Sequence, residues 1–457
     1  MPTGTADPRR VRPRLASALA GGLVAAAVAG SLSACSDDLP PPTYSTATYD
    51  DVARLMQGTL DQRAAALERE DAGRFRATLD RRDADLLRQQ IDYYDNISDL
   101  PVGLLRYRVL PDTVSPVDDS GDTAGGAYGS AGLAGREYWA EVVLALQLDG
   151  FDSAPVRTRD RFLFRTTDDG ERLVVASTSD PAWEDEHPGN TQPWDRERIE
   201  VRQADGVLGI FDDLTVDDAP AVLREAAEGR REVRSVIGGD SAGAGGTGGS
   251  GAEELDGVDG VIVYAVDDAS TLRGLAGQSV GDPDRADGLT VAVPVDTARP
   301  GRGTASYRVF LNTRVLSEPD DVLGRLVRHE LTHALLGPRA RKAPLWLNEG
   351  LAEYTSVQAL PERDRRLPSM ALTIAGTATD LPRSADFAGP DAESWYGVAW
   401  WVCEYIARTY GQRTLLVLLD SLGGGADEGE VLRDALGLDA RELVRRGADL
   451  MAATYRG

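Results

Sequence analysis

His329-Glu330-Leu331-Thr332-His333 is the stretch from which the rest of this chain can be interpreted. Each helical residue advances about 100°, so two histidines four positions apart lie one turn apart on the same face, with Cβ atoms about 6 Å apart. That spacing lets both imidazoles bind one metal ion. Glu330 lies a quarter-turn from His329, where it can reach a water molecule held by the metal, and is predicted to be the general base.

The predicted zinc helix begins after Pro319 and ends at Gly337-Pro338. Asp320 and Asp321 suit the positive end of a helix dipole. Apolar residues recur at three-to-four spacing through the following 15 positions or so, which is the period of an amphipathic helix. The glycine and proline after them are typical stop signals.

A second apolar-rich helix is predicted just after Pro344, with the sequence Trp346-Leu347-Asn348-Glu349-Gly350-Leu351-Ala352-Glu353-Tyr354. Catalytic zinc usually takes three protein ligands and keeps one position for water, so Glu349 is predicted to be the third ligand. Glu353 follows one turn later and is predicted to accept the second ring N–H of a zinc histidine. Tyr396, at the start of a later helix, is our candidate donor to the oxyanion.

Together the two segments resemble the gluzincin metallopeptidases, and among them the bacterial peptidase-MA-like domains, in which PLWLNEGLAEY-type segments follow the zinc helix. The resemblance covers about the last 200 residues and implies that His329, His333 and Glu349 bind Zn²⁺. It also implies that Glu330 is the base and that Glu353 orients a zinc histidine. The chain shows no upstream G-x-M-E-N segment of the large aminopeptidases, which argues against aminopeptidase activity.

Residues 1–35 are predicted to be a lipoprotein signal peptide. Four arginines precede an apolar run from Leu15 to Ala29 that is too short for a comfortable membrane span. Leu32-Ser33-Ala34-Cys35 resembles a bacterial lipobox, in which the cysteine is lipidated. An ordinary secretory signal is the alternative, and Arg9-Arg10 leaves the choice between Sec and twin-arginine export open. We therefore expect a protein anchored by lipid to the extracytoplasmic face of the cell membrane.

The chain is strongly acidic, with a net charge of −25. The predicted signal contributes +3 of this, through four arginines and Asp7, which leaves −28 on the mature protein. Such acidity argues against binding nucleic acid or anionic lipid head groups by charge. Beyond Cys35 the chain has one other cysteine, Cys403, so no intramolecular disulfide is expected; Cys403 is predicted to be a buried apolar residue.

The N-terminal half is predicted to combine helices with an antiparallel sheet. Residues 36–48 are a polar tether, and residues 50–88 have helical spacing with a break at 71–73. Strand patterns follow at 105–109, 138–146, 158–164 and 172–176. This order resembles the NTF2-like superfamily over about residues 49–204, which implies a cone-shaped domain. We expect a non-catalytic role for it, and a flexible hairpin insertion at 113–136.

Residues 205–457 are predicted to form a zincin-like domain, a small sheet with the zinc helices and a helical C-terminal part. A helix is expected at 219–236, strands at 260–266, 289–294 and 307–312, and helices at 395–410, 415–422, 428–435 and 440–455. By the resemblance, strand 307–312 is the edge strand along which a peptide lies. The overall class is α+β.

Two other candidate sites are predicted to have no catalytic role. The glycine-rich segment 238–251 contains Ser241 in a G-x-S-x-G match, but more glycines follow where a nucleophile elbow needs a helix. His187 lies in an acidic segment that reads as a solvated loop. A metal ligand there is the less favoured interpretation.

The sequence therefore predicts a lipid-anchored zinc metallopeptidase acting on peptides or proteins of the cell envelope. Zinc lowers the pKa of its bound water and polarises the scissile carbonyl, while Glu330 moves the proton. The alternative is a non-catalytic envelope lipoprotein that binds a ligand or partner and has a vestigial or structural zinc site. A zinc hydrolase acting on a non-peptide envelope substrate is a third possibility.

Overall fold

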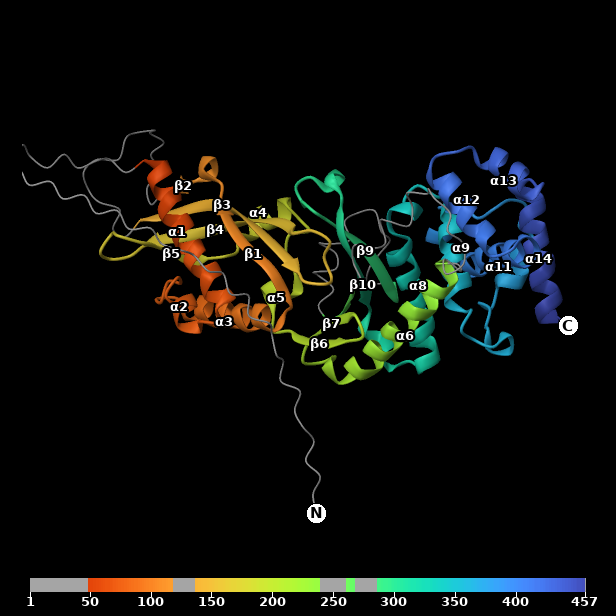
Figure 1. The fold of residues 1–457 in the computed structure, drawn as a ribbon, viewed down its shortest axis with the longest axis horizontal. Coiled ribbons are helices and arrows are strands. Elements are labelled where there is room, and N and C mark those ends of the chain that lie inside the picture. Colours follow the sequence, from red (N-terminus) through yellow and green to blue (C-terminus); the bar gives the residue numbers. More distant parts are fainter. Residues whose placement is uncertain (1–47, 118–135, 239–259, 268–285, 457) are drawn as a thin grey trace, which may run out of the picture. The chain divides into compact units, whose positions relative to one another are not determined.

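The computed structural model describes residues 48–117, 136–238, 260–267 and 286–456 (Figure 1). The predicted signal peptide with Cys35, nearly all of the tether, most of the insertion at 113–136 and nearly all of the glycine-rich segment with Ser241 lie outside these residues. Within the described part of the chain, no helix has the length and apolar character needed to cross a membrane.

Helices and strands alternate in blocks along the chain. In order they are α1 (Tyr49–Glu68), α2 (Ala72–Arg76), α3 (Ala84–Asp99), β1 (Val102–Val109), β2 (Ser115–Pro116), β3 (Glu137–Leu148), β4 (Val156–Thr166), β5 (Leu173–Ser177), α4 (Pro181–Glu186), α5 (Pro193–Arg196), β6 (Glu200–Ala204), β7 (Val207–Phe211), α6 (Ala219–Ile237), β8 (Val261–Ala265), β9 (Gly288–Pro294), β10 (Thr304–Leu311), α8 (Asp320–Leu336), α9 (Leu345–Ser356), α10 (Ala371–Ala375), α11 (Ala392–Tyr410), α12 (Arg413–Gly423), α13 (Glu428–Leu436) and α14 (Ala440–Arg456). The predicted mixture of helix and sheet is confirmed.

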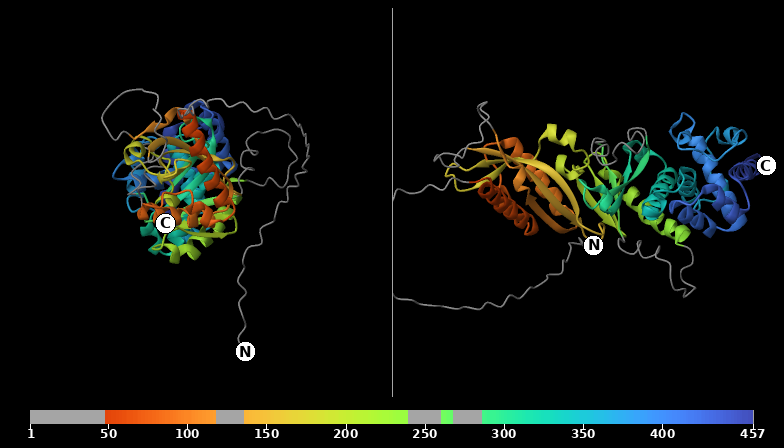
Figure 2. Two further views of the ribbon diagram at one scale, coloured as in Figure 1. Left: turned by 90° about the vertical axis from the view of Figure 1, so that its left-hand side faces the viewer. Right: turned by 90° about the horizontal axis from the view of Figure 1, so that it is seen from above.

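The first sheet is the predicted antiparallel meander, in the order β1-β3-β4-β5, with β2 also paired to β3. The helix α1 packs against β1 and β5 (Figure 2). One continuous helical region to residue 88 was expected, apart from the break at 71–73, but residues 77–83 are not helical. Asp83 begins a new helix there, because its side chain accepts hydrogen bonds from the backbone N–H groups of Asp85 and Leu86.

The second sheet has the order β6-β7-β8-β10-β9, with parallel pairs β7–β8 and β8–β10 and antiparallel pairs β6–β7 and β10–β9. The prediction that strand 307–312 is the edge strand is therefore wrong. That segment belongs to β10, which lies between β8 and β9, and β9 forms the edge. The burial pattern fits this order, because β10 is buried at six of its eight positions whereas β9 is buried at two of seven.

Both faces of the second sheet are buried, and they face different cores. Along β8, Val261 and Val263 join the core beneath the C-terminal helices, whereas Ile262 and Tyr264 join the core of the first sheet. The described residues accordingly belong to one compact unit. The boundary predicted at 204/205 falls inside the β6–β7 hairpin, so β6 belongs with the second sheet.

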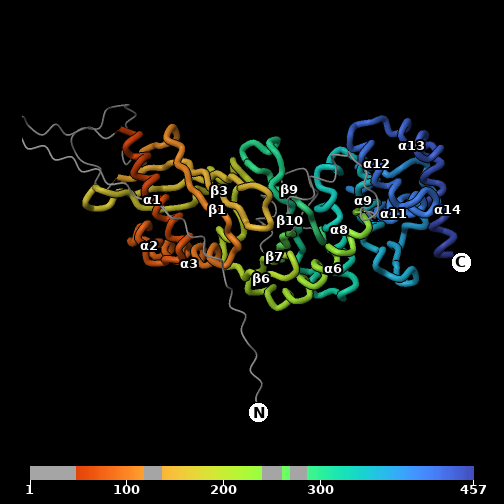
Figure 3. Tube along the Cα trace, in the orientation of Figure 1, coloured from red at the N-terminus to blue at the C-terminus, as the bar shows by residue number. Residues whose placement is uncertain are grey.

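Helices α6 and α9 pack against the predicted zinc helix, α8, and α11 packs against α9 (Figure 3). Gly337 ends α8 with a φ of 51°, a backbone conformation that favours glycine. Gly350 lets α9 approach α11 closely, because a Cβ there would lie 2.6 Å from the carbonyl oxygen of Ala399 and 2.8 Å from the sulfur of Cys403. This contact positions α9 against the helical scaffold.

Candidate metal centre

Three side chains, two from α8 and one from α9, point toward one another. His329 and His333 lie one turn apart on α8, and Glu349 reaches them from α9. The Nε2 atoms of the two histidines are 3.2 Å apart. Oε2 of Glu349 lies 3.4 Å from Nε2 of His329 and 3.3 Å from Nε2 of His333. The three predicted ligands therefore present one atom each to a common point.

These separations fit a tetrahedral metal ion. Zinc bonds to nitrogen and oxygen of about 2.0–2.2 Å place neighbouring ligand atoms about 3.3–3.6 Å apart in a tetrahedron. The three side chains are 13–18% exposed, so they are partly accessible to solvent. Among the described residues, no fourth histidine, cysteine or carboxylate joins this group. The donor set therefore fits zinc and leaves one coordination position for another molecule.

Glu353 lies behind the ligands and connects one of them to an arginine. Its Oε1 is 3.2 Å from Nδ1 of His329, the ring nitrogen that faces away from the cluster. Its Oε2 accepts a 2.7 Å hydrogen bond from Arg325, one turn before His329 on α8. The carboxylate thus has a partner on each oxygen. This arrangement holds the imidazole in one orientation and leaves Nε2 free to bind a metal.

The predicted base, Glu330, is 5% exposed and lies against the edge strand β9. The hydroxyl of Thr290 lies 2.8 Å from the Glu330 carboxylate and 2.8 Å from its backbone carbonyl. A Cβ at Gly288 would lie 2.9 Å from Cγ of Glu330. The strand therefore fixes both the position and the rotamer of the carboxylate, because there is no room for it to swing toward the sheet.

The charges of the cluster balance one another. Burial alone would lower the pKa of His329, but Glu349 and Glu353 outweigh this and raise the pKa well above its usual value. His333 has a raised pKa for the same reason, mainly through Glu349. Burial would raise the pKa of Glu349, yet the two histidines hold it well below its usual range. The pKa of Glu353 falls to about 2. Both carboxylates therefore stay ionised at neutral pH.

Tyr396, the candidate oxyanion donor, lies beside the cluster at the start of α11. Its ring centroid is 6.2 Å from that of His329 and 5.0 Å from that of Phe387, both in edge-to-face contacts. Burial, together with the nearby glutamates, raises the pKa of Tyr396 well above its usual value. The hydroxyl therefore stays protonated and is a hydrogen-bond donor near the site. Its role in stabilising an oxyanion stays a prediction.

The remaining residues considered in the sequence lie elsewhere. His187 ends α4, where its ring stacks on Trp183 at 4.1 Å and its Nδ1 lies 2.8 Å from the Trp183 carbonyl oxygen. It follows α4 directly and is packed against that helix, so it is less free than the predicted solvated loop implies. Cys403 is buried, as predicted, and burial raises the pKa of its thiol.

Sequence reasoning missed two residues of the site, Arg325 and Thr290. Arg325 carries a readable signal, since it stands four residues before His329 on the same helix face and can reach a carboxylate that serves that histidine. Thr290 carries no such signal in the sequence. It is 40 residues from Glu330 in the sequence, and only the strand order brings the two together.

No family model matches the chain, and neither does any curated protein sequence.

Proposed function

We propose that this protein is a zinc-dependent metallopeptidase that hydrolyses peptide bonds in proteins or peptides of the cell envelope. The observation that carries the proposal is the convergence of His329, His333 and Glu349 within 3.2–3.4 Å of one another. The buried carboxylate of Glu330 follows directly on the same helix. This is the donor set and the base that a catalytic zinc site requires.

The chain's own residues supply positioning and proton transfer. A zinc ion bound by the three ligands would activate a water molecule and polarise a carbonyl group. Glu330, fixed by Thr290, accepts a proton from the attacking water and returns it to the leaving amine. Glu353 and Arg325 hold His329 in the tautomer that binds the metal. Tyr396 donates a hydrogen bond to the developing negative charge on the substrate oxygen.

The edge strand β9 supplies a surface for an extended substrate. Among the described strands it pairs only with β10, so its other edge has no strand partner in this part of the chain. Because Thr290 of β9 contacts Glu330, a peptide paired to β9 by backbone hydrogen bonds would run past the base. The proposal thus assigns to β9 the role that the sequence had suggested for strand 307–312.

The replacement Glu330→Gln tests the mechanism. It keeps the size of the side chain but removes the base, so we expect zinc to remain bound and turnover on a protein substrate to fall by about 10²–10⁴-fold. Glu318→Gln, an exposed glutamate just before α8, is the matched control and should retain activity. Undiminished, chelator-sensitive proteolysis by Glu330→Gln would rule the mechanism out.

The alternative is a binding lipoprotein with a vestigial or structural zinc site. A structural zinc takes four protein ligands, whereas the described residues supply three. Three protein ligands with one open position favour an enzyme over a structural zinc site. The same arrangement does not distinguish a peptide substrate from another envelope substrate. A metal-loaded protein that cleaves no peptide library but hydrolyses an envelope ester or amide would select the third possibility.

The proposal also covers the family of this protein and its location in the cell. The gluzincin-like sequence, an NTF2-like N-terminal part and lipidation of Cys35 together describe a membrane-anchored envelope enzyme. The mixed fold supports the first two in outline, with an antiparallel sheet and helices before the helical metal centre. Cys35→Ala should move the protein from the membrane fraction to the soluble fraction. Unchanged membrane association of this variant would contradict the lipid anchor.

A further inference from the structure

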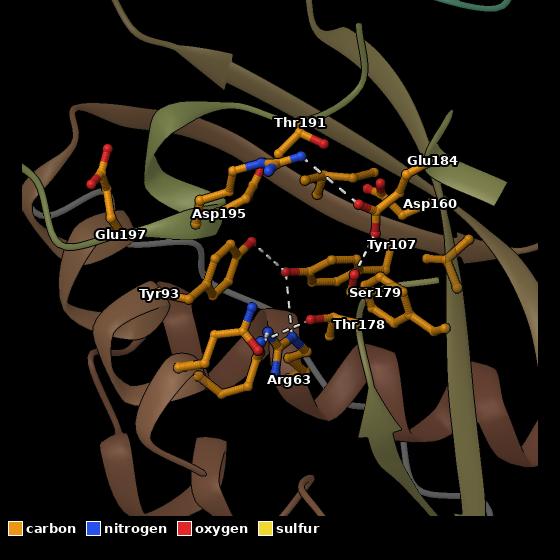
Figure 4. A pocket seen from close by; sticks show the side chains of 16 residues that line it. Arg63, Tyr93, Tyr107, Asp160, Thr178, Ser179, Glu184, Thr191, Asp195 and Glu197 are labelled. Atoms are coloured by element: carbon orange, nitrogen blue, oxygen red, sulfur yellow. Dashed lines mark hydrogen bonds and ion pairs between the residues drawn. The ribbon is translucent and has the colours of Figure 1, made fainter. Parts of the chain in front are cut away.

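A cavity of about 430 Å³ lies within the N-terminal part of the chain, apart from the residues of the metal centre. Residues of α1, α3, β1, β3, β4 and the segment 178–197 line it, and both polar and apolar side chains face it (Figure 4). The size suits an amino acid or a short peptide. None of the functions proposed above uses this cavity.

One side of the cavity carries a buried positive charge. Arg63 is 1% exposed, and within the described part of the chain no carboxylate lies within ion-pair distance of it. Its guanidinium stacks over the rings of Phe75 and Tyr93, donates to the side-chain oxygen of Gln90 and lies 3.4 Å from the hydroxyl of Tyr107. Its Nη1 has no hydrogen-bond partner. A buried guanidinium stays charged, so an anion near it would be strongly stabilising.

The other side carries two carboxyl groups. The side chain of Asp160 of β4 makes no hydrogen bond or ion pair with a described residue, and the carboxylate of Asp195 of α5 accepts one 2.8 Å hydrogen bond from the backbone of Gln192. Figure 4 shows them across from Arg63, with the paired hydroxyls of Tyr93 and Tyr107 between. Burial raises the pKa of Asp195 to about 7. These groups lack the cationic partner that buried carboxylates normally have.

The remaining charges of the lining are largely satisfied within the protein. Glu184 accepts hydrogen bonds from the Ser179 hydroxyl and the Asp180 backbone and lies 3.9 Å from a nitrogen of Arg196. Among the described residues, the cavity therefore has an unpaired cation, Arg63, on one side and two carboxyl groups without a cationic partner, Asp160 and Asp195, on the other.

From this charge distribution we infer that the cavity binds a small amphoteric molecule, an amino acid or short peptide. The carboxylate of this ligand faces Arg63 and the Tyr93–Tyr107 pair, and its ammonium group faces Asp160 and Asp195. The inference does not depend on the proposed peptidase activity, because no residue of the metal centre takes part.

A series of probes tests both charged ends. Isothermal titration of the full chain would compare 4-aminobutanoate and glycylglycine with butylamine and butanoate, which each carry one of the two charges. Because amino acids also bind zinc, the titrations are repeated in His333→Ala, where the metal centre is disabled. We expect at least one amphoteric probe to bind, in both proteins, at least tenfold more tightly than butylamine and butanoate.

Variants of the cavity complete the test. Asp160→Asn keeps the size of the side chain and should weaken binding of the amphoteric probe at least tenfold, while Asp168→Asn, an exposed control at the β4–β5 turn, should not. Arg63 stacks on core aromatic rings, so the probes rather than a substitution test its role. The inference fails if neither amphoteric probe exceeds its single-charge analogues, if Asp160→Asn binds normally, or if His333→Ala abolishes binding.

Discussion

Replacing Glu353 by glutamine should weaken zinc binding although it removes no metal ligand. In the structure one carboxylate oxygen lies 3.2 Å from Nδ1 of His329 and the other accepts a 2.7 Å hydrogen bond from Arg325. Glutamine has nearly the same shape but only one acceptor oxygen, and it carries no charge. One of the two contacts must therefore be lost, and a contact that remains with His329 no longer has a charged acceptor.

The magnitude follows from these contacts. A hydrogen bond to a charged group stabilises by about 1.5–3 kcal/mol, whereas a neutral one contributes about 0.5–1.5 kcal/mol. The difference of about 1–2 kcal/mol corresponds to roughly a tenfold change in an equilibrium constant, and losses of 10–100-fold are typical when a carboxylate behind a metal-binding histidine is removed. We expect the zinc dissociation constant of Glu353→Gln to rise by about 10–100-fold.

The assay is competition for zinc between the protein and a chelator of known affinity at neutral pH. Glu404→Gln is the matched control, because Glu404 is 4% exposed and accepts a 2.6 Å hydrogen bond from Arg408 but belongs to the scaffold of α11. It should lower the melting temperature and leave zinc affinity unchanged. A Glu353→Gln protein that is folded and binds zinc as tightly as the wild type would refute the reasoning.

Three further predictions concern the base, the helix packing and the cavity. Thr290→Val removes the hydroxyl that fixes Glu330 and should lower kcat on a protein substrate about tenfold with zinc content unchanged; a normal kcat would contradict this. Gly350→Ala places a methyl group 2.6 Å from the Ala399 carbonyl oxygen and should lower the free energy of unfolding in urea by about 1–3 kcal/mol, whereas an unchanged value would show that the helices can separate. Burial raises the pKa of Asp195 to about 7, so the folded chain keeps a proton that the unfolded chain loses above about pH 4; this contribution to stability is complete below pH 4 and is lost as the pH rises through 7. The wild type should therefore lose more unfolding free energy than Asp195→Asn between pH 5 and pH 8, and equal losses would contradict the assignment.

The helices of the metal centre could be predicted from sequence because their signals are local. Pro319 and the two aspartates mark the start of α8, and Gly337 marks its end, where the structure has the positive φ that glycine favours. The four-residue spacing of the histidines fixes their common face. The position of Glu349 was also predicted from a local signal. A new helix begins after Pro344, and the short connection allows α9 to return past α8.

The strand order of the second sheet could not be predicted in the same way. Both β9 and β10 are apolar segments of similar length, and no local pattern states which of them pairs with β8. Pro294 at the end of β9 was the available signal for an edge strand. Thr290 reaches Glu330 only because of this strand order, so its contact with the base could not be predicted from the sequence either.

The cavity of the N-terminal part could not be predicted from the sequence for a related reason. Arg63, Asp160 and Asp195 come from three separate elements, and each on its own reads as an ordinary charged surface residue in the sequence. Their shared burial depends on how α1 and α5 close over the curved sheet. The sequence predicted the long helices and the main strands of this region, but not α4, α5 or the charges that the fold encloses.

The central claim is that His329, His333 and Glu349 bind a catalytic zinc ion, and the metal content of the purified chain tests it most directly. We predict about one zinc per chain in the wild type and none in His333→Ala, with both proteins folded by circular dichroism. Absence of zinc from both proteins, even after the metal is supplied, would contradict the account.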